Sequence, residues 1–117
     1  MSHHQLHEKL QGAQRDLLMG VSDFREFIKI YKTAESAYRS AHGRAMLQAT
    51  GTEKLKKAAA DIVASAEMAA RNEAEALYEW HKENIRSLRQ YLSSVQSEAA
   101  GNREEDKATN YGAGDPF

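Results

Sequence analysis

The short segment Thr50-Gly51-Thr52-Glu53 constrains this chain more than any other, because it separates two long stretches with helical periodicity. Gly51 can adopt the left-handed conformation that ends a helix. Thr50 or Thr52 can cap the helix that follows, and Thr50 with Glu53 fits a capping box. The only proline is Pro116, so long helices are permitted on both sides of the turn. We therefore expect an all-α protein organised around this segment.

Apolar residues before the turn recur at alternating steps of three and four. They predict a helix over about 3–19 and a second over about 22–49. A kink is expected near Gly20, because glycine weakens a helix interior by about 1 kcal/mol relative to alanine. Residues 52–100 contain neither Gly nor Pro and predict one long helix. Residues 101–117 lack periodicity and predict a flexible tail.

The two long helices are expected to fold back as an antiparallel hairpin in which residue i faces roughly residue 101 − i. Tyr38 then meets Ile62, Tyr31 meets Ala69 or Ala70, and Phe24 meets Leu77 beside Trp80. Bulky residues on one helix that face alanines on the other fill space at native density. Such a hairpin has a wide apolar stripe and no third layer. We therefore expect the chain to assemble as an oligomeric helical bundle.

Composition limits the function classes. A chain of 117 residues predicts one domain, over 1–100, followed by the tail. The net charge of −1 gives no global basic field that would demand nucleic acid or an anionic membrane. No apolar run approaches a membrane span and no signal-peptide region opens the sequence. The absence of cysteine excludes thiolate chemistry. We expect a cytoplasmic protein with no membrane partner.

A polar and aromatic layer lies on the apolar seam before the turn, formed by Tyr31, Glu35, Tyr38 and His42 with Arg39 beside it. Such a layer could be a binding pocket, or an acid–base pair with a shifted pKa. The alternative, which carries more weight, is a packed polar layer that fixes helix register or oligomer state.

Basic residues recur at spacings that place them on single helix faces. They are Lys54, Lys56 and Lys57 after the turn, and Arg86 and Arg89 further along. Binding of phosphates along such faces is one interpretation. Acidic residues lie among these basic ones, and the other interpretation is therefore an ordinary solvated helix surface. Direct binding of nucleic acid or a nucleotide is therefore kept as the alternative function.

No motif in the sequence predicts catalysis. The chain has no Gly-rich phosphate loop, nucleophile elbow or His-Glu-x-x-His motif. His3, His4, His7 and Glu8 could bind a metal ion, since His3 and His7 are four residues apart on one helical turn, but the site lacks an obvious third and fourth protein ligand. We expect no metal, no cofactor and no enzyme activity.

Two resemblances add to this interpretation. The runs Tyr38-Arg39-Ser40-Ala41-His42-Gly43-Arg44-Ala45, Ala49-Thr50-Gly51-Thr52 and Leu88-Arg89-Gln90-Tyr91-Leu92-Ser93-Ser94-Val95-Gln96-Ser97 resemble small helical proteins of tailed bacteriophages, some encoded near recombination genes. Together with the apolar stripe and the absence of catalytic motifs, the resemblance leads us to expect a phage-encoded, oligomeric, non-catalytic protein of the host cytoplasm that binds another macromolecule. It would be an inhibitor of a host defence or host enzyme, or an accessory to phage DNA metabolism. The helical-hairpin proteins of type VII secretion are similar in size, but place Trp-x-Gly where this chain has Ala49-Thr50-Gly51-Thr52.

Overall fold

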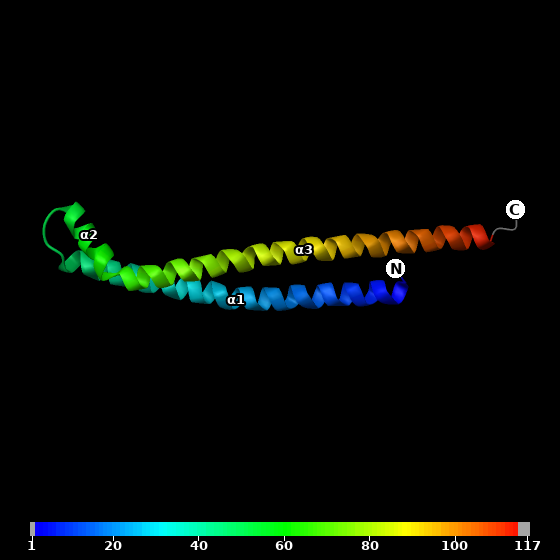
Figure 1. Ribbon diagram of the computed structural model, residues 1–117, viewed down its shortest axis with the longest axis horizontal. Coiled ribbons are helices and arrows are strands. Elements are labelled where there is room, and N and C mark those ends of the chain that lie inside the picture. Colours follow the sequence, from blue (N-terminus) through cyan, green and yellow to red (C-terminus); the bar gives the residue numbers. More distant parts are fainter. Residues whose placement is uncertain (1, 115–117) are drawn as a thin grey trace. The chain divides into compact units, whose positions relative to one another are not determined.

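The computed structural model describes the backbone of residues 2–114 and the side chains of residues 2–104. Within that part of the chain there are three helices and no strand, which confirms the predicted all-α class. The helices are α1 (His3–Gln48), α2 (Glu53–Val63) and α3 (Ser65–Gly114) (Figure 1). Two compact units share these helices: the first holds the described residues up to Val21 and from Asn84 onward, and the second is Ser22–Glu83.

The turn between α1 and α2 is formed as predicted. Gly51 has a φ of 107°, in the left-handed region that favours glycine. Thr52 is the N-cap of α2, and its hydroxyl accepts a hydrogen bond from the backbone N–H of Leu55 at 3.3 Å. The capping box expected from Thr50 and Glu53 is wrong, because Glu53 is already the first residue of α2.

α1 is one continuous helix, so the predicted separate helix over 3–19 is wrong, whereas the kink near Gly20 stays a prediction. Gly20 is buried, and a Cβ atom there would lie 2.8 Å from Cδ1 of Leu88 on α3. The glycine therefore makes room for a neighbouring side chain and does not end the helix. The start of α1 has a capping box that the sequence analysis missed. Ser2 Oγ accepts from the Gln5 N–H at 3.1 Å, and Gln5 Oε1 accepts from the Ser2 N–H at 3.0 Å.

The single helix predicted over 52–100 differs from the structure in two places. α2 ends at Val63, and Ala64 separates it from α3 with φ −94° and ψ 17°. As a result α2 leaves the line of α3 within the second unit (Figure 1). A hydrogen bond of 3.0 Å from His42 Nε2 to Asp61 Oδ1 holds α2 against α1 just before this break.

The predicted helix end near residue 100 is also wrong, because α3 continues to Gly114. Arg103, Glu104, Glu105 and Lys107 are good helix formers, and extending a helix adds one hydrogen bond per residue. Residues 115–117, the end of the predicted tail, lie outside the described residues. A separate domain boundary at 100 stays a prediction.

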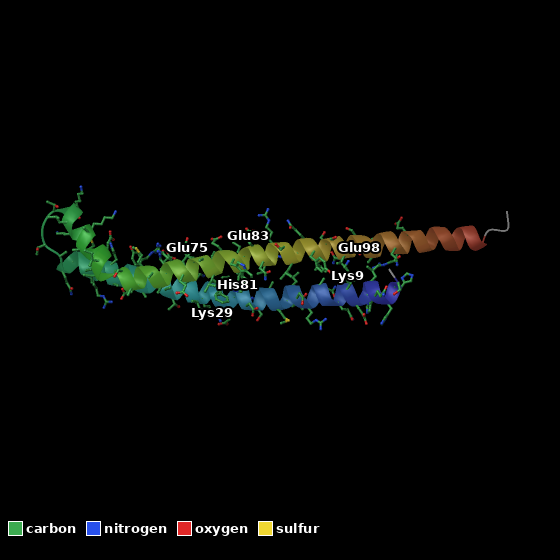
Figure 2. All side chains as sticks on the ribbon, in the orientation of Figure 1. Lys9, Lys29, Glu75, His81, Glu83 and Glu98 are labelled. Atoms are coloured by element: carbon green, nitrogen blue, oxygen red, sulfur yellow. The ribbon has the colours of Figure 1, made fainter. Side chains whose placement is uncertain are left out.

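In the first unit α1 and α3 pack antiparallel. Lys9 Nζ lies 3.2 Å from Glu98 Oε1, and the two side chains point toward one another in Figure 2. The approach of Gly20 to Leu88 comes further along α1 and earlier along α3. The predicted register would have placed Lys9 opposite Leu92.

Antiparallel packing also holds in the second unit, with a register that departs from the prediction away from the turn. His42 meets Asp61, close to the expected position. Tyr31, however, meets Tyr78 and not Ala70. The break at Ala64 explains this shift in pairing. Because α2 leaves the line of α3, its residues do not continue the α1–α3 pair, and residues further along α3 face α1 than predicted.

The side of α2 and α3 that faces α1 follows alternating steps of four and three without interruption. These buried or half-buried positions are Ala60, Ala64, Glu67, Arg71, Ala74, Tyr78, His81, Ile85, Leu88, Leu92, Val95 and Ala99. Ile62, which the predicted register placed opposite Tyr38, lies off this seam and is 76% exposed, so that pairing is wrong. Among the described residues, the fully buried hydrophobic positions are mostly alanines, so the core is thin.

Candidate interaction surface

Three of the predicted site residues, Tyr31, Tyr38 and His42, are half-buried in the second unit. The Tyr31 ring is tilted against Tyr78 with centroids 5.2 Å apart. Tyr38 lies 5.6 Å from the His42 ring, and the Arg71 guanidinium sits over Tyr38 at 4.9 Å. The Tyr31–Tyr78 and Tyr38–Arg71 contacts join α1 to α3, and the Tyr38–His42 contact lies within α1.

Glu35 and Arg39 belong to the outer edge of this layer. Arg39 Nη2 lies 2.8 Å from Glu35 Oε1, and the Glu35 side chain is 31% exposed. Both line an open depression of about 210 Å³ on the surface of α1. Burial raises the pKa of Tyr31 above its ordinary value of 10.0, and the carboxylates of Glu75 and Glu35 raise it further. A tyrosine kept neutral in this way suits packing, and makes a poor nucleophile.

The polar seam of α3 was not predicted as part of this layer. Glu67 Oε2, Arg71 Nε and His81 Nδ1 are buried and have no hydrogen-bond partner among the described residues. Polar groups buried without partners lower the stability of the helix pair. Polar residues at seam positions can also favour one alignment of the two helices over others. The alternating steps of four and three could have identified these residues, had they been counted from Ala60.

Beside the layer lies a group of apolar side chains that we call the aromatic flank: Phe27, Ile30, Leu77 and Trp80. Phe27 stacks on His81 with centroids 4.0 Å apart, and His81 meets the edge of Trp80 at 4.8 Å. These contacts bring the two helix faces together. Ile30 is nevertheless 48% exposed, Leu77 40% and Trp80 61%. The sequence analysis expected Phe24 to meet Leu77 beside Trp80, but the Phe24 ring stacks on Tyr78 with centroids 5.3 Å apart.

The predicted basic residues lie in different units. On α2, Lys54 and Lys57 are exposed, whereas Lys56 is half-buried and lies 3.9 Å from Glu53 Oε1. Arg86 and Arg89 are exposed on the α3 segment of the first unit. These groups are therefore not shown to form one phosphate-binding surface.

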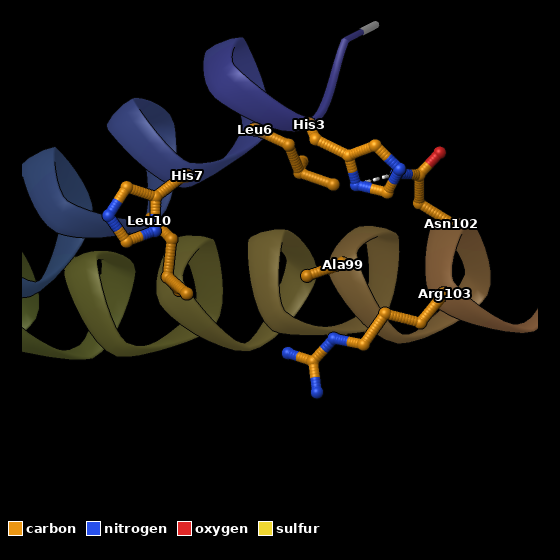
Figure 3. A pocket seen from close by; sticks show the side chains of 7 residues that line it. All are labelled: His3, Leu6, His7, Leu10, Ala99, Asn102 and Arg103. Carbon is orange, nitrogen blue, oxygen red and sulfur yellow. Dashed lines mark hydrogen bonds between the residues drawn. The ribbon is translucent and has the colours of Figure 1, made fainter. Parts of the chain in front are cut away.

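The N-terminal histidines of the first unit do not converge on one point. His3 and His7 line an open pocket of about 270 Å³ with Leu6, Leu10, Ala99, Asn102 and Arg103 (Figure 3). The Asn102 side-chain amide lies 3.2 Å from His3 Nδ1, and His4 Nε2 lies 3.1 Å from Glu8 Oε1. In the described part of the chain, no three metal-ligating side chains form a group able to hold an ion.

No helix formed by the described residues combines the length and apolar character needed to cross a membrane. Comparison with protein-family models, with curated proteins and with solved structures found no match to this chain.

Proposed function

We propose that this chain is a non-catalytic helical protein that assembles as an oligomer and acts by binding another macromolecule. The supporting observation is the exposed aromatic flank over a core made mostly of alanine. Monomeric proteins rarely leave contiguous large apolar side chains in water, and such patches commonly mark association sites. An antiparallel helical hairpin lacks a third layer, and a second copy would supply one.

The chemistry of the layer supports binding over catalysis. Glu35 is paired with Arg39 and His42 with Asp61. Their contacts are those of helix packing, and no described cavity gathers an acid, a base and a nucleophile. The phage resemblance offers two kinds of partner, a host protein that is inhibited or the machinery of phage DNA metabolism.

Trp80 provides a direct test, since it is the only tryptophan in the chain and its side chain lies on the flank. We expect sedimentation to give a mass that is a multiple of 13.1 kDa. The fluorescence emission of Trp80 should move to shorter wavelength as association covers its indole. A monomer at all concentrations, with unchanged emission, would refute the proposal.

Two variants with the same new charge locate the association surface. Leu77→Asp introduces a carboxylate into the flank and should shift the protein toward the monomer, leaving the emission of Trp80 that of an exposed indole. Ala76→Asp places the same carboxylate on an exposed neighbouring position and should keep the parental mass. Equal effects of both substitutions would show that the flank is not the contact surface.

A further inference from the structure

A hollow of about 270 Å³ lies in the second unit, where α1 meets the break between α2 and α3. Val63, which ends α2, and Glu67, in the first turn of α3, line it on one side. Because α2 leaves the line of α3 at Ala64 (Figure 1), the two helices diverge there. The other side is formed by residues on one face of the last turns of α1: Ala41, Arg44, Ala45 and Gln48.

The inner part of this hollow holds a carboxylate without a partner. Glu67 is half-buried, and its Oε2 atom is buried without a hydrogen-bond partner among the described residues. Glu67 also makes no ion pair with any of them. Removing a polar oxygen from water without a compensating hydrogen bond costs free energy. A ligand that donates hydrogen bonds to Glu67 would therefore be favoured here.

The opening of the hollow carries the opposite charge. Arg44 is exposed, and its Nε donates to the backbone carbonyl oxygen of Ser40 at 3.4 Å. The Arg44 guanidinium makes no ion pair with any described residue, Glu67 included, although both side chains line the same hollow. The remaining N–H groups of a guanidinium form a fork that matches the two oxygens of a carboxylate. Arg44 is thus placed to receive an anionic group.

The wall between these charges is apolar and the space is small. Ala45 is buried and Ala41 half-buried, while Val63 is 68% exposed. The volume of about 270 Å³ is below the roughly 300–1,000 Å³ of pockets for drug-sized ligands. The ligand must also suit both charges. Arg44 opposes a simple cation and Glu67 opposes a simple anion, whereas a small zwitterion complements both.

We infer that this hollow binds a free α-amino acid with an apolar side chain. The ammonium group donates to Glu67, and the carboxylate accepts from Arg44. The side chain of the ligand packs against Ala41, Ala45 and Val63. The hollow shares no lining residue with the aromatic flank, so the inference goes beyond the proposed function and does not depend on it.

The test uses the full chain and three probes of similar size: L-leucine, L-leucinamide and N-acetyl-L-leucine. Leucinamide keeps the ammonium group and lacks the carboxylate, and N-acetyl-leucine has the reverse. An NMR titration at about pH 6.5, where both free amines are protonated, should show L-leucine binding with a Kd on the order of 1 mM. Each analogue should bind at least about tenfold more weakly. Either no binding of L-leucine or an analogue that binds as tightly would overturn the inference.

Matched variants locate the site. Glu67→Gln should weaken L-leucine binding about tenfold and abolish the preference for L-leucine over N-acetyl-L-leucine. Glu73→Gln, which removes an exposed carboxylate of the same helix, should change neither. Arg44→Gln should abolish the preference for L-leucine over L-leucinamide. Equal effects of the two glutamate variants, or a preference for L-leucine over L-leucinamide that survives in Arg44→Gln, would contradict the inference.

A measurement without ligand separates this inference from its main rival, an ion pair between Arg44 and Glu67 in solution. Because Glu67 lacks a partner, Glu67→Gln should keep or raise the melting temperature of the free protein. A lower melting temperature, with no additional loss in the double variant with Arg44→Gln, would show that the two residues pair and would refute the inference.

Sedimentation with and without L-leucine keeps the proposed function separate. An oligomer that does not bind L-leucine refutes only the amino-acid site. A monomer that binds L-leucine refutes only the proposed assembly.

Discussion

Gly20 and Gly43 both lie inside α1, yet the structure predicts opposite results when each is replaced by alanine. In a helix interior the change from Gly to Ala stabilises by about 1 kcal/mol. A Cβ atom on Gly43 would meet nothing within 4 Å. Gly43→Ala should therefore gain the full amount, which raises the melting temperature by roughly 4 °C for a chain of this size.

At Gly20 the same gain is opposed by a clash. The added Cβ would lie 2.8 Å from Leu88 Cδ1 and 3.9 Å from Ile85 Cγ1. Displacing a packed side chain costs about 1–3 kcal/mol, so Gly20→Ala should be neutral or destabilising by up to about 2 kcal/mol. Removing the obstacle reverses the sign: in a Leu88→Ala background, Gly20→Ala should stabilise by about 1 kcal/mol.

The measurement is urea unfolding followed by helical circular dichroism, with all variants at one protein concentration because assembly would contribute to stability. If Gly20→Ala and Gly43→Ala stabilise equally, the close approach of α3 to Gly20 is absent and the reasoning is refuted. If Gly20→Ala destabilises equally with and without the Leu88 side chain, the loss of stability does not come from a clash with Leu88.

Three further predictions concern the polar layer and the basic residues. Because the folded pKa of Tyr31 is raised, its contribution to stability is fully present below its unfolded pKa near 10.0 and is lost as pH rises through the folded value; urea midpoints of Tyr31→Phe should therefore fall less steeply in alkali than those of the parent, and parallel curves would contradict this. A double-mutant cycle with His42→Ala and Asp61→Ala should give a coupling of about 0.5–1 kcal/mol near neutral pH, and a value of zero would mean that their hydrogen bond does not hold α2. Single-stranded and duplex DNA should show no gel shift at low salt, because several basic groups are already paired with acids. A shift that weakens with salt would favour the nucleic-acid alternative. In that case Arg89→Gln would test whether the first unit contributes to binding.

The helical class and the turn could be predicted because they depend on local chemistry. Gly51 and Thr52 act through their own backbone and side chain, and both behave as expected. Gly20 shows where local reasoning fails: by propensity it weakens the helix, but the side chain of Leu88 decides its role, and that contact joins residues far apart in sequence.

The layer was half predictable for a related reason. Tyr31 and Tyr38 were found because aromatic residues at seam spacing are conspicuous. Arg71 and His81 were missed because the predicted register brought other residues of the second arm against α1, although both occupy the seam. The break at Ala64 has no sequence signal of its own, since alanine favours helix. The shift in register that it causes could therefore not be predicted either.

The alanine-rich core has a calorimetric consequence. Unfolding raises heat capacity chiefly by exposing apolar surface, by about 12–15 cal/mol/K per residue in ordinary globular domains. Here a dissociated chain already exposes side chains as large as Trp80 and Ile62, so unfolding uncovers less new apolar surface. Its heat capacity increment should be smaller per residue and its curve of stability against temperature flatter. Association, by covering apolar surface, would return part of that increment, so the curvature should depend on protein concentration.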